Sequence, residues 1–208
     1  MTTEQLRHRM PPILKALKER SLRGRTPVEG LRRTECAYHG WDTVHADAAS
    51  WEPFAPGDAF GGLEAHHCFK GTVTLPEASA GKRVVCLVST GASDIWNNNN
   101  PQFLAYVDGR LVCGLDVNHN EFDLAACAVP GESHELALYV YCNTPARDVF
   151  LRVETAERDD DVTGLYYDLR APYEVCALLA DDDTRAIGIM KHLNRALNLL
   201  DLRDLDSG

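Results

Sequence analysis

The 208-residue chain lacks a long apolar run, an apolar leader and an excess of basic charge. No stretch approaches the roughly 18 consecutive apolar residues of a membrane-spanning helix. The N-terminal MTTEQLRHRM also lacks the apolar centre of a signal peptide. The formal net charge of −10 disfavours non-specific binding to nucleic acid or to anionic membranes. We therefore expect a cytoplasmic protein with no nucleic-acid partner and no membrane partner.

Cysteine pairs and familiar catalytic motifs are missing as well. The seven cysteines include no C-x-x-C pair, and their odd number argues against a disulfide framework or a zinc site. Cys86 lies inside an apolar run, so we predict that the cysteines are small buried hydrophobic residues in a reducing compartment. The chain has no G-x-S-x-G, P-loop, G-x-G-x-x-G or H-E-x-x-H motif. No assembled catalytic site is therefore expected.

What the chain does contain is a change of hydrophobic period along its length. Apolar residues recur at helical spacing over residues 2–22, where Pro11-Pro12 are expected to divide the segment into two helices. The period is then two, and strands are predicted over 67–75, 82–89, 102–107, 110–113, 122–129, 135–141, 149–155 and 165–169. Asp108-Gly109 predicts a type I′ hairpin turn.

No long helix separates these strands, which excludes parallel βαβ units. The predicted fold is mainly β: an antiparallel two-sheet β-sandwich, jelly-roll-like, with N-terminal and C-terminal helices. We expect an N-terminal helical segment over residues 1–30, a β-sandwich accessory domain over 31–180, and an amphipathic helix over 181–208. Leu193, Leu197 and Leu200 form the apolar stripe of this last helix and are its candidate docking surface. An uncovered stripe would favour a homo-oligomer.

Several polar residues invite a metal or catalytic interpretation. His66 and His67 are adjacent in a predicted strand, so they face opposite sides and do not bind one ion together without a bulge. His67 is expected to face inward with Phe69, and His66 outward. The carboxylates of residues 159–161 are expected to be solvated. These patterns predict no metal site.

Two polar segments are candidate contacts for a glycan or another domain. The first, over 116–121, offers Asp116, Asn118, His119 and Glu121 just after the hairpin. The second, over 94–101, places Trp96 beside Asn98 in a run of asparagines, which would give a sugar a flat apolar face and amide hydrogen bonds. Both segments are also typical of loops whose Asp and Asn side chains bond their own backbone.

Four ordered blocks of sequence resemble the N-terminal region of α-mannosidases of glycoside hydrolase family 38, of the cytosolic bacterial and vacuolar fungal type. They are GGLEAHHCF (61–69), QFLAYVDGRLVCGLDVNHNE (102–121), YYDLR (166–170) and LNRALNLLDLR (193–203). The resemblance implies an N-terminal β-sandwich that precedes a zinc-dependent catalytic domain with an Asp nucleophile and a retaining mechanism. His45-Ala46-Asp47 imitates the family's first zinc motif, but it lies too far upstream and no apolar strand precedes it.

On this resemblance the chain is an accessory domain of an α-mannosidase and ends before the catalytic domain. We expect no catalytic or metal residue in the chain, no cofactor of its own, and no activity alone, with zinc bound by the absent domain. The expected partners are that catalytic domain, another copy of the chain, and carbohydrate. The main alternative is a carbohydrate-binding module that itself holds mannose-containing glycans. Linkage specificity belongs to the absent domain.

Overall fold

The computed structural model describes residues 3–38, 40–90, 101–117, 119–180 and 182–201, and it forms two compact units. The helical unit comprises Met1–Arg23 and Arg158–Gly208, and the sandwich unit comprises Gly24–Glu157. Among the described helices, none is long and apolar enough to cross a membrane.

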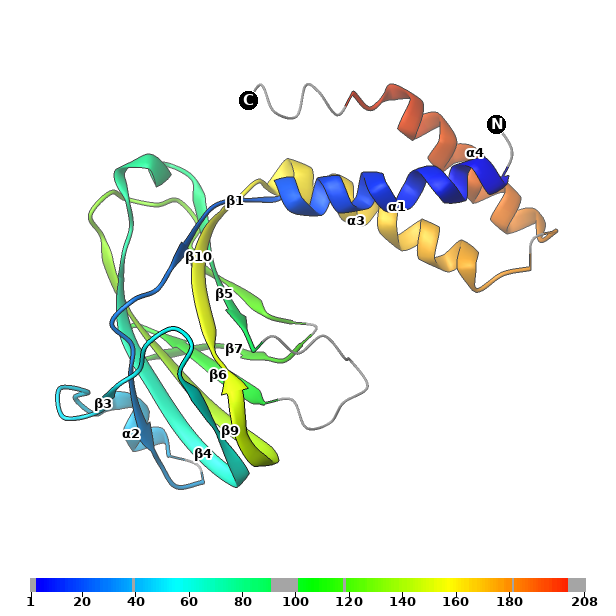
Figure 1. Cartoon of the computed structure of the whole chain (residues 1–208). Helices are drawn as coiled ribbons and strands as arrows, with labels where there is room; N and C mark the ends of the chain where they lie inside the picture. The colour runs from blue at the N-terminus through cyan, green and yellow to red at the C-terminus, as the bar shows by residue number, and fades with distance from the viewer. Residues whose placement is uncertain (1–2, 39, 91–100, 118, 181, 202–208) are drawn as a thin grey trace. The chain divides into compact units, whose positions relative to one another are not determined.

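The sandwich unit consists of two β-sheets (Figure 1). The four-stranded sheet has the order β1-β10-β5-β8, and the six-stranded sheet has the order β3-β2-β4-β9-β6-β7. The strands and the two short helices are β1 (Leu22–Pro27), β2 (Arg32–Glu35), α2 (Trp41–His45), β3 (Glu52–Pro53), β4 (Ala59–Thr74), η1 (Glu77–Ser79), β5 (Arg83–Ser89), β6 (Gln102–Val107), β7 (Arg110–Leu115), β8 (Glu121–Ala125), β9 (Ser133–Phe150) and β10 (Arg152–Arg158). The predicted antiparallel sandwich with helices at both ends of the chain is confirmed.

The core of the sandwich lies between the two sheets and is built on the long β4–β9 pair. Alternate residues of each strand point inward, which is why β4 and β9 each supply a row of buried side chains. Phe69 is fully buried, and its ring packs edge-on against Phe54 and Phe60 with centroid separations of 4.8 Å and 5.0 Å. This aromatic cluster determines which residues of β4 point into the core. Because side chains alternate along a strand, it also determines which residues point outward.

The predicted hairpin at Asp108-Gly109 is confirmed. Both residues have positive φ, 51° and 73°, as a type I′ turn requires. The Asp108 carboxylate accepts a hydrogen bond from the Glu135 backbone N–H at 2.9 Å and lies 2.8 Å from His134 Nδ1. Asp108 thereby ties the β6–β7 turn to the start of β9.

This contact predicts a pH-dependent contribution to stability. The hydrogen bond with His134 is the main cause that holds the pKa of Asp108 below its ordinary value of 3.8. A carboxyl group whose pKa is lower in the folded state stabilises the fold above its unfolded pKa, and this contribution is lost as the pH falls through the folded pKa. We expect Asp108→Asn to lower the urea midpoint modestly at neutral pH, because the carboxylate is about half exposed. The difference from wild type should shrink as the pH is lowered to about 2; a gap that stayed constant would contradict this role.

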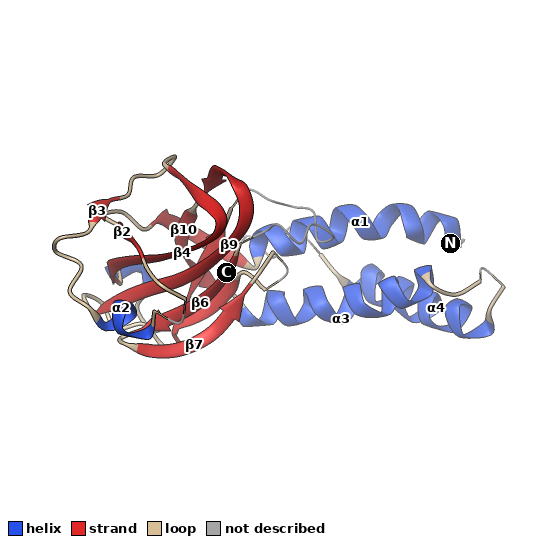
Figure 2. Ribbon diagram, turned by 90° about the horizontal axis from the view of Figure 1, so that it is seen from below, coloured by secondary structure: helices blue, strands red, loops and turns tan. Residues whose placement is uncertain are grey.

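The helical unit contains α1 (Thr3–Arg20), α3 (Asp160–Ala177) and α4 (Thr184–Leu199), and Figure 2 shows α1 and α3 lying side by side. α1 is one continuous helix, so the predicted break at Pro11-Pro12 is wrong. Proline at position 11 has no N–H to donate to the carbonyl of Arg7. The Tyr173 hydroxyl of α3 lies 3.4 Å from that oxygen and supplies a donor instead.

The strand predicted over 165–169 is also wrong, because these residues belong to α3. Asp159 caps this helix: its side chain accepts a hydrogen bond from the Val162 N–H at 3.0 Å. Asp160 and Asp161 lie in the first turn, where negative charge is favourable. The acidic run therefore starts a helix rather than ending a strand.

The stripe of α4 is covered within the helical unit. Leu193 and Leu197 are 5% and 2% exposed and belong to a core shared with α1 and α3, while Leu200 is half-buried. The residues of this core are Leu6, Met10, Leu17, Val162, Tyr166, Leu169, Cys176, Ala186, Met190, Leu193 and Leu197. Two of the three leucines expected on a docking surface thus hold the unit together from inside.

Candidate functional site

The outer face of the six-stranded sheet carries an unusual number of aromatic side chains. In one row, His66 of β4, Tyr141 of β9 and Gln102 of β6 lie opposite one another. In the next row, Tyr139 of β9 lies beside Leu104 of β6. Because side chains two residues apart share a face, the alternation of β9 places both tyrosines on this side. The regular register of the sheet therefore assembles a flat, largely aromatic surface.

Helix α2 and the segment before it rise above this surface. α2 begins after Gly40, where an added Cβ would lie 3.0 Å from the Ala37 carbonyl oxygen and 3.2 Å from Cys36 Sγ. A side chain at position 40 would therefore force this tight turn to move. The turn brings Trp41 to within 6.0 Å of Tyr139, measured between ring centroids. Val44, fully buried, anchors the helix on the sheet.

Together these elements form an aromatic groove with a volume of about 480 Å³. The His66 ring lies 5.1 Å from Tyr141, 5.8 Å from Tyr139 and 5.5 Å from Tyr38 between centroids. The Tyr139 hydroxyl lies 2.8 Å from His66 Nδ1, which fixes the orientation of the imidazole. The groove is lined by Tyr38, Trp41, His66, Gln102, Phe103, Leu104, Gly114, Leu115, Asp116, Tyr139 and Tyr141.

Asp116 is the predicted site residue that the structure places in this groove. It follows β7, and its Oδ1 accepts a hydrogen bond from the His119 backbone N–H at 2.7 Å. Its own N–H donates to the His119 carbonyl at 3.0 Å. Both interpretations of this segment therefore apply to Asp116. Its side chain bonds the backbone of its own loop, and its carboxylate lines a groove that could hold a ligand.

Of the other residues predicted in the two polar segments, the structure describes His119 and Glu121, and neither of them lines the groove. His119 is largely exposed and does not line the groove. Glu121 begins β8 and is paired with Leu87 of β5 in the four-stranded sheet. Trp96, Asn98 and Asn118 lie outside the described residues. Leu193, Leu197 and Leu200 belong to the helical unit.

The two adjacent histidines lie on opposite faces of β4, as predicted. His66 faces the groove, and His67 is buried at 1% exposure beside Phe60, with its Nε2 3.1 Å from the Gly61 carbonyl oxygen. Among the described residues, no group of three or more His, Cys, Asp or Glu side chains is arranged to hold a metal ion. Asp47 instead accepts a hydrogen bond from the Ala49 N–H in its own turn.

The cysteines described here are all free thiols, and four of them are buried. Burial is the main cause that raises the pKa of Cys68 and Cys86 to about 12 and that of Cys142 to about 11. A thiol with such a high pKa is a poor nucleophile at neutral pH. The prediction of small buried hydrophobic residues is confirmed for these positions, whereas Cys127 is exposed.

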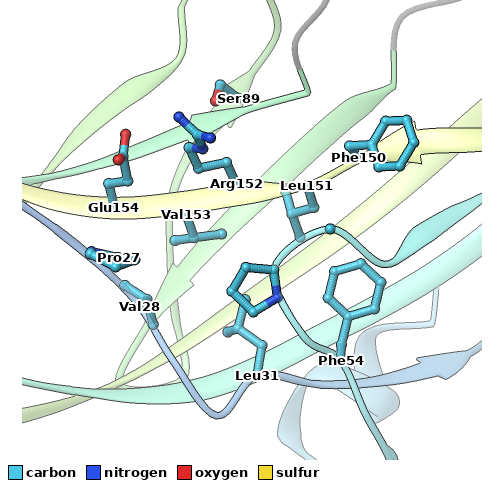
Figure 3. A pocket seen from close by; sticks show the side chains of 12 residues that line it. Pro27, Val28, Leu31, Phe54, Ser89, Phe150, Leu151, Arg152, Val153 and Glu154 are labelled. Atoms are coloured by element: carbon cyan, nitrogen blue, oxygen red, sulfur yellow. The ribbon is translucent and has the colours of Figure 1, made fainter.

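A larger hollow, of about 810 Å³, opens at the edge of the two sheets (Figure 3). Its floor includes Val28, Leu31 and Phe54, which are also part of the sandwich core. Arg152 and Glu154 lie on the other side of β10 from Val153, and Glu154 is paired with Arg25 at 3.6 Å. The polar side chains among the described residues that line this hollow are those of Ser89, Arg152 and Glu154.

The sequence interpretation missed most of the groove. Tyr38, Trp41, Tyr139 and Tyr141 were not predicted as site residues. One signal in the sequence could have indicated the groove. Tyr139 and Tyr141 are two residues apart in one strand and so share a face, and His66 lies in another strand. That pattern identifies one face of a strand, but it does not say which strands are neighbours.

No family model matches the chain, and no curated protein sequence matches it. Solved structures of β-glucuronidases show a distant similarity. The Ruminococcus gnavus enzyme is 8% identical with a TM-score of 0.47, and the alignment covers 64% of this chain and 28% of that one. The Faecalibacterium prausnitzii enzyme is 13% identical with a TM-score of 0.43, and the alignment covers 65% of this chain and 32% of that one. The Bacteroides uniformis enzyme is 11% identical with a TM-score of 0.48, and the alignment covers 64% of this chain and 18% of that one. The chain spans less than a third of each of these structures, and at this level the likeness carries no argument about activity.

Proposed function

We propose that this chain is a non-catalytic, carbohydrate-binding accessory unit of a cytoplasmic α-mannosidase, and that the aromatic groove holds a mannose-containing glycan. The observation that carries the proposal is the groove itself. Sugar rings present an apolar C–H face that packs on aromatic rings, while their hydroxyls need polar partners. Tyr and Trp side chains offer a flat apolar face with a polar tip. Asp116, His66 and Gln102 add hydrogen-bonding groups within the same hollow.

The size and charge of the groove favour binding over hydrolysis. Its volume lies in the range of about 300–1,000 Å³ that is usual for small-ligand sites. Glycoside hydrolysis in most families needs two carboxyl groups, about 5–10 Å apart, across the bond that is cleaved. Asp116 is the only carboxylate among the described residues that line the groove. The described lining can hold a sugar, and it supplies one carboxylate where this chemistry needs two.

The resemblance to α-mannosidases supports the proposal that this chain is part of such an enzyme. Two of the four similar blocks, 61–69 and 102–121, supply His66, Gln102, Leu104 and Asp116 to the groove. In this proposal the zinc and the nucleophile belong to a catalytic domain of the same protein, which this chain supports as a partner. A second candidate function follows from the resemblance alone: a scaffold that packs on that domain and binds no sugar.

Isothermal titration of α-linked mannose oligosaccharides into the chain separates these functions. We expect weak, saturable binding that falls by at least about tenfold, or about 1.4 kcal/mol, in Trp41→Ala. Gly114→Leu is a second variant: position 114 is exposed, and a Cβ there meets only ordinary contacts of 3.8 Å and 3.9 Å, so the longer side chain should fill the groove without disturbing the sheet.

Three results would contradict the proposal or move the site. If no sugar bound at millimolar concentration, the carbohydrate-binding function would be excluded and the scaffold function would remain. Binding that survives both groove variants but is lost in Trp96→Ala would place the glycan on the asparagine-rich segment. Release of mannose from a chromogenic α-mannoside by the chain alone would show that it is catalytic.

A further inference from the structure

We infer that the ligand of the aromatic groove carries an organic ammonium group, as a 2-amino-2-deoxyhexose residue does. This inference rests on the proposed carbohydrate function of the groove and names the chemical class of sugar that it selects. It is carried by the combination of side chains in the groove rather than by any one of them.

The lining combines aromatic rings with a single negative charge. Tyr38, Trp41, Tyr139 and Tyr141 surround the hollow, and no lysine or arginine occurs among the described residues that line it. The face of an aromatic ring carries a negative partial charge, so a cation within about 6 Å of the ring is attracted by about 0.5–2 kcal/mol. A neutral sugar gains only the stacking contribution from the same rings. The groove therefore discriminates in favour of a cation.

Asp116 adds the full charge that an ammonium group would pair with. Its Oδ1 lies 2.7 Å from the His119 backbone N–H and 3.3 Å from His119 Nδ1, and the Asp116 side chain is 46% exposed. A charge-assisted hydrogen bond from N⁺–H to a carboxylate is about twice as strong as a neutral one. The overall charge of −10 also favours the approach of a cation over that of an anion.

Matched ligands test the charge separately from the shape. Choline and 3,3-dimethylbutan-1-ol have nearly the same shape, but only choline is charged; mannosamine and mannose form the corresponding sugar pair. We expect each ammonium ligand to bind at least about tenfold more tightly than its neutral counterpart by isothermal titration. Asp116→Asn should remove most of this difference, because the amide keeps the hydrogen bond to His119 but not the charge.

Asp123→Asn is the control for the variant. It removes the same charge from β8, outside the groove, and should leave the preference intact. Equal affinity for charged and neutral ligands would overturn the inference, while saturable mannose binding would leave the proposed function standing. If only the ammonium ligands bound, the mannose assignment would fail and the inference would stand. Absence of binding by all four ligands would overturn both.

Discussion

Truncation of Phe69 to alanine should lower the free energy of unfolding of the sandwich unit by about 3–5 kcal/mol, the usual cost of removing a buried Phe ring. Phe69 is fully buried and contacts Phe54 and Phe60 edge-on, so the cavity would form at the centre of the core. Domains are stable by only about 5–15 kcal/mol, so this loss would leave the sandwich marginal. It would also release the face of β4 that carries His66.

Tryptophan fluorescence reports this unit selectively, because Trp41, Trp51 and Trp96 all lie within Gly24–Glu157. The urea midpoint measured in this way should fall strongly for Phe69→Ala. Phe150→Ala is the matched control: Phe150 is 54% exposed, and its loss should change stability by no more than about 0.5 kcal/mol. Similar midpoints for the two variants would mean that the aromatic cluster does not organise the core.

Truncation of Leu197 to alanine should destabilise the helical unit by about 2–5 kcal/mol. Leu197 is 2% exposed in the core that α4 shares with α1 and α3. Ellipticity at 222 nm is the appropriate signal, because the three long helices belong to this unit. The helical signal should therefore be lost at lower urea concentration than in the wild type.

Leu199→Ala is the control on the same helix, since Leu199 is 87% exposed. It should shift the 222 nm transition by no more than about 0.5 kcal/mol. If Leu197→Ala behaved like Leu199→Ala, the stripe would not be covered by α1 and α3, and its assignment as a docking surface would regain support.

Local chemistry explains which elements could be predicted. The Asp108-Gly109 turn depends on two adjacent residues that tolerate positive φ, and both adopt it. The opposite orientation of His66 and His67 follows from the pleat of a single strand. Features that depend on neighbouring residues in the chain are visible in the sequence, because no distant contact is needed to decide them.

Errors arose where distant contacts override local preference. Pro11 weakens the helix locally, but the Tyr173 hydroxyl, 166 residues away from Arg7, reaches the carbonyl that Pro11 leaves without a donor. Residues 165–169 have strand-like composition, yet the Asp159 cap and burial against α1 and α4 favour helix. Tertiary packing contributes more free energy than intrinsic propensity at such positions.

The amino-acid sequence by itself determined the class of fold, the hairpin and the absence of a familiar catalytic motif, because each depends on composition or on residues close together in the chain. Only the tertiary structure decided that the α4 stripe is internal and that an aromatic groove exists. His66 and Tyr139 are 73 positions apart, and their contact requires β4 to pair with β9 in one particular register. That register is selected by burial of the whole inner face, a property of the sheet rather than of either residue.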